Sequence, residues 1–455
     1  MTIRLKPELP PNCNPFATDF SLWGDISRGV QPIVVSPNIG QGLTSTSALR
    51  IAVVTETYPP EVNGVARTVA QVVHGLIARG HVVELIRPRQ GLNDIPRVEP
   101  QLTEVLAHGI PIPRYPGLRV GVPSGRRLRR LWELRRPSVV HIATEGPLGW
   151  SALQAARRLG LPVVSEFRTN FHAYTQYYGI GWVEGLIKRY LRRFHNLTAT
   201  TMVPTSGLAR ELQKSGFERL EVVPRGVDVD LFHPGHRSEA LRQQWGARPE
   251  TLVALSVGRL APEKNLELLQ SSYQAMRVAN PDAKLVVVGD GPARRSFQAA
   301  LPEAVFAGMR TGAELSAHVA SADLLLFPSV TETYGNVTPE AMASGLAIVA
   351  YDYAAARELV EPGVSGWLAP LGDAAQFKAL ASRAANAVGE VRQAGQRARA
   401  AVTAQGWGRI IGEIECHYRT AIEAASERNQ HRLSPTGSPN GPISAEELGL
   451  RLPSA

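Results

Sequence analysis

The sequence predicts an α/β protein built from two doubly wound domains that face each other across a cleft. Short apolar runs that suit buried strands alternate with stretches of helical spacing, a pattern typical of parallel sheets with helices on both faces. This alternation pauses once, at Pro224–Pro234 and Gly246–Glu250, and then begins again. In doubly wound sheets ligands bind beyond the carboxyl ends of the strands, so two facing sheets place a binding cleft between the domains.

The first domain, predicted over residues 48–228, contains five apolar runs of strand length. The predicted strands are Ile51–Thr55, Val82–Ile86, Val139–Ile142, Pro162–Ser165 and Thr201–Val203. The predicted helices between them are Val65–Arg79, Ser124–Arg135 and Pro147–Leu159. Gly80, directly after the first of these helices, is a typical helix end.

The second domain, predicted over residues 229–405, repeats this pattern. Its predicted strands are Leu252–Val257, Lys284–Gly289, Ala304–Ala307, Asp323–Pro328 and Ala347–Ala350. A helical stretch at residues 406–427 is expected to return to the first domain and pack on it. The ends of the chain, residues 1–47 and 428–455, carry little periodicity and are predicted to be a flexible arm and a flexible tail.

The composition excludes several classes of protein. Hydrophobic residues make up 44% and charged residues 20% of the 455 positions, a balance typical of globular chains and not of disordered or fibrous ones. Two cysteines are too few for a disulfide framework or a thiolate metal cage. The net charge is +9, and no apolar run approaches the roughly 18 residues of a membrane span. We therefore expect a cytoplasmic protein that contacts an anionic surface.

The most informative segment, Ser329–Gly345, follows a predicted strand with a polar turn and then a helix that starts near Asn336 or Val337. The free N–H groups and positive dipole end of such a helix suit a phosphate or a sugar hydroxyl. Glu332 lies in the turn and Glu340 about one turn inside the helix. Carboxylates at this spacing can accept hydrogen bonds from hydroxyls at two points of one elongated ligand. A capping acid plus a surface acid is the alternative interpretation.

A second segment places Gly258, Arg259 and Lys264 between the end of a strand and the start of a helix. The glycine allows close approach of the backbone, and the two cations can converge on one anion. A diphosphate leaving group needs this compensation because negative charge develops on it as its bond to the sugar breaks. A solvated charged loop is the alternative.

A third segment, the Pro/Gly loop that ends at Asn63 and Gly64, joins the first strand to the first helix. Gly64 permits a backbone contact with a phosphate that a Cβ atom would block. The signal is weak alone, because most Asn-Gly pairs are simply turns.

Together these motifs resemble the retaining glycosyltransferases of the GT-B fold, in the family that includes bacterial lipid mannosyltransferases, sulfoquinovosyl and glucosyl lipid synthases, and sucrose synthases. Five matching pieces lie in the expected order between about residues 50 and 370. They are the Pro-Pro-x-x-Asn-Gly loop ending at Gly64, Arg225–Phe232, Gly258-Arg259-x4-Lys264, Val288–Pro292 and Glu332-x7-Glu340. The stretch Ser165–Tyr174 is similar to the mannosyl and sulfoquinovosyl lipid branch.

The resemblance implies a role for each matching position. Glu332 would hold hydroxyls of the donor sugar, and the catalytic cations Arg259 and Lys264 would stabilise the diphosphate as it leaves. Glu340 would hold the ribose hydroxyls, and Gly64 would let the first domain close on the diphosphate. The other predicted donor-binding residues are Gly258, Gly289, Gly291, Met309, Arg310, Thr333, Tyr334, Gly335 and Asn336.

On the acceptor side, the resemblance points to Arg168, His172 and Glu145. Family members often have a His where this chain has Arg168. His172 is one candidate for that role, and Arg168 itself is another, as a contact for a phosphate or an acidic acceptor. Glu145 follows a predicted strand at the edge of the cleft, where contact with the acceptor and a helix-capping role both remain open.

Asp228 and Asp230 form an Asp-x-Asp pair of the kind that holds a divalent cation in other glycosyltransferases. Because the pair lies at the domain junction, we interpret it as structural. We predict no metal requirement and no cofactor beyond the nucleotide sugar that serves as donor.

Two basic segments, Arg126–Arg136 and Lys188–Arg193, combine arginines with apolar residues at helical spacing. Such helices suit docking on anionic lipid headgroups. A basic face that simply contacts solvent is the alternative interpretation, and the sequence favours neither. The chain carries no recognisable nucleic-acid-binding motif, so no nucleic-acid partner is expected.

The sequence therefore predicts a retaining transferase that moves a hexose from a nucleotide-diphosphate sugar to a hydroxyl of a lipid or glycan acceptor, at the inner face of the cytoplasmic membrane. The resemblance favours GDP-mannose over UDP-glucose. It also implies that the leaving phosphate takes the acceptor's proton, so no second catalytic carboxylate is needed, unlike in a glycosidase. The alternatives are a nucleotide-sugar 2-epimerase of the same fold and a non-catalytic glycosyltransferase-like binding module.

Overall fold

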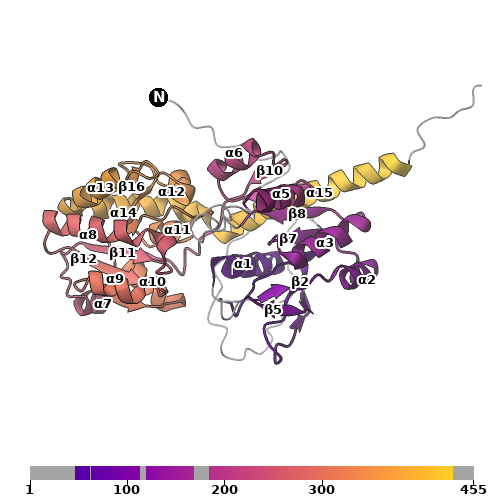
Figure 1. Ribbon diagram of the computed structural model, residues 1–455, viewed down its shortest axis with the longest axis horizontal. Helices are drawn as coiled ribbons and strands as arrows, with labels where there is room; N and C mark the ends of the chain where they lie inside the picture. Colours follow the sequence, from indigo (N-terminus) through magenta and orange to yellow (C-terminus); the bar gives the residue numbers. More distant parts are fainter. Residues whose placement is uncertain (1–46, 62, 113–118, 169–183, 434–455) are drawn as a thin grey trace, which may run out of the picture.

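The computed structural model describes residues 47–61, 63–112, 119–168 and 184–433, which form two lobes joined side by side (Figure 1). Each lobe contains one mainly parallel sheet with helices on both faces. The α/β fold class and the two doubly wound units predicted from the sequence are thereby confirmed. Within the described residues, no helix is both long and apolar enough to cross a bilayer.

The first lobe contains an eight-stranded sheet with the order β10-β9-β8-β7-β1-β2-β4-β3. Its strands are β1 Arg50–Val54, β2 Val82–Pro88, β3 Val98–Glu99, β4 Leu102–Ala107, β7 Val139–Ile142, β8 Val163–Glu166, β9 Thr200–Val203 and β10 Leu220–Val222. Its helices are α1 Gly64–Ala78, α2 Gly125–Arg135, α3 Pro147–Arg158, α5 Glu184–His195 and α6 Ser206–Lys214. A separate hairpin pairs β5 Gly109–Pro111 with β6 Arg119–Gly121.

The second lobe contains a six-stranded parallel sheet with the order β13-β12-β11-β14-β15-β16. Its strands are β11 Val253–Val257, β12 Lys284–Val288, β13 Val305–Gly308, β14 Leu324–Phe327, β15 Ala347–Tyr351 and β16 Gly366–Ala369. Its helices are α7 Glu239–Gln244, α8 Leu266–Ala279, α9 Arg294–Ala300, α10 Gly312–Ala320, α11 Val337–Ala343, α12 Ala354–Leu359, α13 Ala374–Asn386 and α14 Val388–Val402.

The sequence pattern does not predict strands β3 to β6, β10 or β16. Most of these strands have only two to four residues, and Val98–Glu99 and the ends of the hairpin are exposed, so they leave little hydrophobic signal. β4 is longer, but its alternation of Leu, Thr, Glu and Val is too short to separate a strand from a helical turn.

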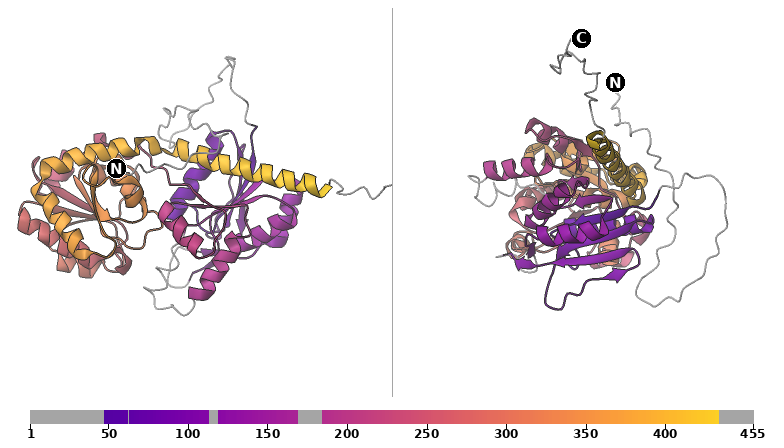
Figure 2. Two further views of the ribbon diagram at one scale, coloured as in Figure 1. Left: turned by 90° about the horizontal axis from the view of Figure 1, so that it is seen from above. Right: turned by 90° about the vertical axis from the view of Figure 1, so that its right-hand side faces the viewer.

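The long helix α15, Trp407–Leu433, returns from the second lobe and runs along the first (Figure 2). Its buried residues Ile410, Ile411, Ile414 and Tyr418 join the core of the first lobe. A Cβ atom on Gly75 of α1 would lie 2.6 Å from Ile411, so the glycine lets the two helices meet closely. The predicted end at residue 427 is wrong, because the helix continues to Leu433 and no proline interrupts the sequence before Pro435.

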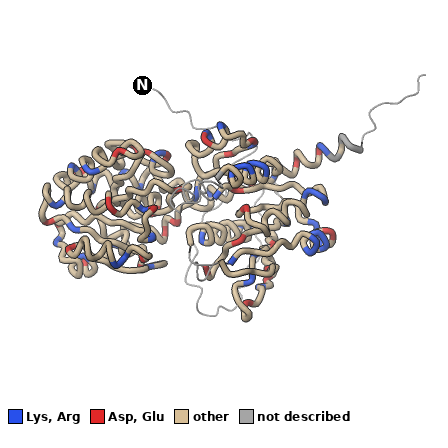
Figure 3. The backbone as a smooth tube through the Cα atoms, in the orientation of Figure 1, with Lys and Arg blue, Asp and Glu red and all other residues tan. Residues whose placement is uncertain are grey.

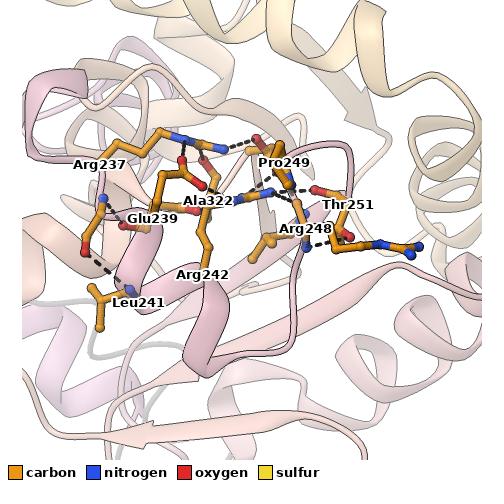
Figure 4. A network of polar contacts seen from close by, with 12 residues as sticks. Arg237, Glu239, Leu241, Arg242, Arg248, Pro249, Thr251 and Ala322 are labelled. Carbon is orange, nitrogen blue, oxygen red and sulfur yellow. Dashed lines mark hydrogen bonds and ion pairs between the residues drawn. The ribbon is translucent and has the colours of Figure 1, made fainter.

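A buried arginine ties the segment that enters the second lobe to its sheet (Figure 4). Arg242 of α7 is 0% exposed and donates to the main-chain oxygens of Ser321, Arg248 and Thr251 at 2.9, 3.1 and 2.7 Å. It also donates to Asp323 Oδ2 at 3.2 Å, and that same oxygen accepts from Val253 N of β11. This cluster fixes the position of the central strand whose far end leads to the candidate site.

Candidate active site

The turn between β14 and α11 carries Glu332, which forms an ion pair with Lys264 Nζ. Ser329 Oγ donates to the same carboxylate oxygen, Oε1, at 2.7 Å. Burial by itself would raise the pKa of Glu332, but the neighbouring Lys264 ammonium and the Ser329 hydrogen bond outweigh it and hold the pKa below its ordinary value. Glu332 is therefore an ionised carboxylate paired with a cation at the carboxyl edge of the second sheet.

The loop after β11 carries the two predicted cations in different settings. Arg259 is exposed, with its guanidinium 4.0 Å from the Glu263 carboxylate. Lys264 ends a short 3-10 turn, Pro262–Lys264, that precedes α8. Lys264 is separated from α8 by Asn265, whose positive φ of 54° turns the chain, while Arg259 lies further back in the loop after β11. This turn directs the Lys264 ammonium to Glu332.

The predicted donor-binding glycines Gly289 and Gly291 pack against the loop that holds Arg259. A Cβ atom on Gly289 would lie 1.9 Å from the Gly258 oxygen, and one on Gly291 would lie 2.3 Å from the Leu260 oxygen. Leu260 N also donates to the Asp290 oxygen at 3.0 Å. These glycines therefore allow two backbone loops to interlock beside the cations; their contact with a nucleotide stays a prediction.

Glu340 lies in the first turn of α11 and faces the first lobe. Its Oε1 atom is 3.4 Å from Nη2 of Arg67 on α1, which bridges the two lobes. Burial raises the pKa of Glu340 to about 7, since Arg67 only partly offsets the loss of solvent. Close by, a Cβ atom on Gly64 would lie 3.8 Å from Asn336 Nδ2, so the first lobe's loop does approach the start of α11.

Sequence reasoning missed Arg67. The available signal was its position in the first turn of the predicted helix Val65–Arg79, three residues after Gly64. Its partner is 273 residues away in the chain, and no local pattern reveals such a pair.

Thr333 and Tyr334 contact the main chain of the first lobe. Thr333 Oγ1 donates to the Arg168 oxygen at 3.0 Å, and Tyr334 OH donates to the Arg225 oxygen at 3.3 Å. Tyr334 is 1% exposed, so its side chain has a structural role. Only its backbone groups remain for contact with a donor substrate. Gly335 follows with a positive φ of 89° and forms the turn into α11.

Met309 and Arg310 follow β13, beside the loop of Gly289, whose N–H donates to the Gly308 oxygen at 2.9 Å. Met309 is 58% exposed, and Arg310 pairs with Glu314 of α10 at 3.2 Å. Their role in a nucleotide pocket stays a prediction.

The three acceptor-side residues differ in setting. Arg168 is buried and forms an ion pair with Glu166 at the end of β8. Glu145 is 4% exposed and lies 3.3 Å from His195 Nε2, an arrangement that leaves it little access to a ligand. His172 lies outside the described residues.

Glu56, which sequence reasoning did not select, takes the helix-capping role that was considered for Glu145. Its carboxylate accepts from Leu148 N of α3 at 2.9 Å and from Gly121 N at 2.5 Å. Burial nevertheless raises its pKa to about 7. The signal in the sequence was an acid directly after the first strand.

A cleft of about 230 Å³ opens between the lobes beside Glu332 and Thr333. Its walls are formed by α6 of the first lobe, including Leu208, and by Arg357 and Glu358 of α12. Glu358 Oε1 accepts from Ser206 Oγ at 2.7 Å, which links the two walls.

Asp228, the first acid of the Asp-x-Asp pair, accepts from Leu231 N at 2.9 Å and from Asp230 N at 3.3 Å, and so closes its own turn. In the described part of the chain, no group of three or more His, Cys, Asp or Glu side chains is placed to hold a metal ion.

The comparisons with known proteins place this chain in a class. Residues 62–231 match Glycosyltransferase Family 4, and residues 251–386 match Glycosyl transferases group 1. The chain belongs to this glycosyltransferase family, and it is an enzyme of the GT-B fold, as the resemblance predicted. The predicted activity class, hexosyl transfer, is confirmed at this level. The alternatives, an epimerase or a binding module, have no support among these matches.

Particular relatives narrow the branch. The chain is 35% identical over 377 residues to a GDP-mannose-dependent alpha-mannosyltransferase of Mycobacterium tuberculosis, covering 81% of this chain and 96% of that protein. It is 36% identical over 388 residues to the protein of the same name from Mycolicibacterium smegmatis, covering 84% and 100%. The structure of sucrose-phosphate synthase from Thermosynechococcus elongatus superimposes with a TM-score of 0.68 at 19% identity, covering 83% and 100%, which supports the fold alone.

Proposed function

We propose that this chain transfers mannose from GDP-mannose to a hydroxyl of a lipid acceptor, with retention of the anomeric configuration. The observation that carries the proposal is the Lys264–Glu332 ion pair, which joins the cation loop after β11 to the turn before α11. These are the residues that the family resemblance assigns to the diphosphate and to the donor sugar. The near full-length similarity to two GDP-mannose-dependent transferases supports the choice of donor.

Lys264 changes partner when the donor binds in this mechanism. Its ammonium moves from Glu332 toward the diphosphate and, with Arg259, offsets the negative charge that develops on the leaving group. Glu332 is then free to accept hydrogen bonds from sugar hydroxyls as an ionised carboxylate. The ion pair thus keeps both groups charged and correctly placed before the donor arrives.

Glu340 and Arg67 bring the two lobes together around the nucleotide. A carboxyl with a pKa of about 7 can both donate and accept hydrogen bonds near neutral pH, which suits two adjacent ribose hydroxyls. Gly64, opposite Asn336, leaves room for a phosphate oxygen beside the backbone of α1. Closure of the lobes excludes water and limits hydrolysis of the donor.

The decisive experiment incubates purified protein with labelled GDP-mannose or UDP-glucose and a lipid extract. Mannosyl transfer to the organic phase, with an α-linked product identified by NMR, supports the proposal. Transfer from UDP-glucose at a higher kcat/KM than from GDP-mannose contradicts the choice of donor. Addition of EDTA is expected to leave the rate unchanged; loss of activity that magnesium restores would contradict the prediction of no metal requirement.

We further propose that the first lobe contacts an anionic membrane through the basic faces of α2 and α5 (Figure 3). The apolar side of α2 is unavailable for insertion, because Leu128 and Trp132 are buried in the core of the lobe. What remains exposed on α2 is mainly charge, with Leu134 86% exposed among arginines. Binding of this kind is salt-dependent.

A hollow of about 610 Å³ between α2 and α3 adds to this surface. It is lined by Arg126, Arg127, Trp150 and Arg158, and Arg193 of α5 lies 5.9 Å from the centre of the Trp150 ring. Cosedimentation with vesicles that contain anionic phospholipid is expected and should fade above about 0.5 M salt. Equal binding to neutral vesicles would contradict the charge-based contact.

A further inference from the structure

A small void of about 20 Å³ lies at the junction of the lobes, between α1, the carboxyl ends of β8 and β9, and α15. This is room for one or two particles of water size. Most of its wall is apolar, and the charged side chains that line it are Glu166, Arg168 and Arg225. The void therefore brings two cations and one acid together at the junction of the lobes.

Arg168 brings several N–H hydrogen-bond donors to this void. The residue is 4% exposed, and its Nη2 atom is paired with Glu166. Within the described residues, its Nε and Nη1 atoms are buried without a hydrogen-bond partner. Since buried N–H groups in proteins are nearly always paired, a guanidinium in this state indicates a ligand on its remaining side.

The neighbouring acid, Glu166, is already paired through both of its carboxylate oxygens. Glu166 Oε1 lies 2.8 Å from His141 Nε2, while its Oε2 atom pairs with Arg168. Although burial opposes it, Arg168 and His141 lower the pKa of Glu166 to about 2, so this carboxylate carries its full charge. His141 is held in turn by Tyr418 of α15, whose hydroxyl lies 2.6 Å from Nδ1. The contacts from Tyr418 through His141 to Glu166 thus hold the Arg168 guanidinium in place.

Arg225 is compensated more weakly. Within the described residues no carboxylate lies at ion-pair distance from its guanidinium; Glu166 and Glu332 attract it only from farther away, and its guanidinium carbon lies 6.0 Å from the centre of the Tyr334 ring. Burial, together with repulsion from Arg168, lowers the pKa of Arg225 to about 10, so it stays charged at neutral pH. Arg225 is partly exposed, and the two cations and one ionised carboxylate leave a net positive charge beside the void, which a bound counter-ion would offset.

We propose that a small inorganic anion of the size of chloride binds in this void, between Arg168 and Arg225. A halide accepts hydrogen bonds from both guanidiniums and has no hydrogens of its own to satisfy. A water molecule would need acceptors for its two hydrogens. The Glu166 oxygens are already paired with His141 and Arg168, and Thr68, Val72, Ile410 and Ile414 offer mainly methyl groups. The volume of the void, about 20 Å³, suits a small ion better than an organic anion.

The anion would act on the catalytic loop through the backbone of the two arginines. The main-chain oxygens of Arg168 and Arg225 accept hydrogen bonds from Thr333 and Tyr334, the two residues that follow Glu332. Neutralising the arginines stabilises the junction and holds this loop in register with the first lobe. The inference is independent of which donor or acceptor the enzyme uses.

Bromide replaces chloride in such sites and can be located by its anomalous scattering. Crystals of the full chain grown in sodium bromide are expected to show an anomalous peak between the Arg168 and Arg225 guanidiniums. Density without an anomalous signal would mean water only and would overturn the proposal. A peak that disappears on soaking with GDP-mannose would assign the site to a donor oxygen instead, and would also overturn it.

A second measurement uses thermal unfolding in sodium chloride and in sodium gluconate at equal ionic strength. The wild-type chain is expected to unfold about 2–4 °C higher in chloride. Arg168→Gln and Arg225→Gln should lose this difference, whereas Arg383→Gln, which removes an exposed arginine of α13, should keep it. If either junction variant kept the full chloride effect, the proposal would be wrong; if the variants fail to fold, the bromide experiment on the wild type still decides.

Discussion

Arg242 in the second lobe and Arg168 at the lobe junction are both almost fully buried, but their surroundings differ. Arg242 is 0% exposed and donates to three main-chain oxygens and to Asp323. Arg168 is 4% exposed and is paired with Glu166 through Nη2, while within the described residues its Nε and Nη1 atoms have no hydrogen-bond partner; in Arg242 only Nε is in that state. A guanidinium with most of its donors paired is a structural anchor. One that keeps two buried donors open, next to a second cation and a catalytic loop, belongs to a binding site.

The largest effect is expected from Arg242→Met, which tests the structural side of this contrast. Removal of the guanidinium leaves Asp323 and three carbonyl groups buried with fewer partners, so the free energy of unfolding should fall by about 3–5 kcal/mol. Urea denaturation measures this change, and donor affinity of the folded fraction should be unaltered. Arg383→Gln, which breaks an exposed pair with Glu390, serves as control. A loss below about 1 kcal/mol would show that the cluster is no anchor.

Lys264→Ala should give the next largest effect, on turnover and not on stability. Without its ammonium the leaving diphosphate loses a preorganised positive charge, so kcat/KM should fall by about 10²–10³-fold. Steady-state kinetics with a labelled donor measures the loss. Lys214→Ala, at an exposed position of α6, is the matched control and should keep the parent rate. Near-parent turnover of the Lys264 variant would remove the basis of the site assignment.

Glu340 extends the contrast to buried acids, because its pKa is raised where that of Glu332 is lowered. The folded state keeps the Glu340 proton up to about pH 7, whereas the unfolded chain loses it near 4.5. Between these values the folded state binds more protons, so the stabilising contribution is complete below pH 4.5 and is lost as pH rises through 7. Glu56 contributes in the same direction.

Glu340→Gln should therefore flatten part of the stability profile. The difference in unfolding free energy between pH 5 and pH 8 is expected to shrink by about 1–3 kcal/mol relative to the wild type. Urea titrations at the two pH values provide the measurement. An unchanged pH profile would mean that Glu340 is ionised in the folded protein.

The smallest effect is expected from Arg67→Ala. The Arg67–Glu340 pair bridges the lobes, but the arginine side chain is 49% exposed, so the pair contributes at most about 1 kcal/mol. The donor KM should rise at most about fivefold, with little change in kcat. A loss of kcat instead would place Arg67 in contact with the reacting groups.

Most of the fold was predictable because apolar periodicity is a local property of the chain. The run Val139–Ile142 is found as β7 with the same limits, and the predicted helix starting at Pro147 differs from α3 by one residue at its end. Two motifs likewise lie within single strand–loop–helix units: Gly258-Arg259-x4-Lys264, directly after β11, and Glu332-x7-Glu340. The parts of the site that one such unit carries were therefore accessible from the residues alone.

The contacts that complete the site depend on chain segments far apart in sequence, and only the tertiary structure decided them. Tyr418 and His141 are 277 positions apart, and Thr333 and Arg168 are 165 apart. Whether an arginine is an anchor or an open binding group depends on which carbonyls and carboxylates the fold brings to it, as Arg242 and Arg168 illustrate. The sequence by itself determined the two sheets and the charged motifs at their edges, because hydrophobic period and chain order are local. The partner of each buried charge is set by packing between elements, which no local pattern records.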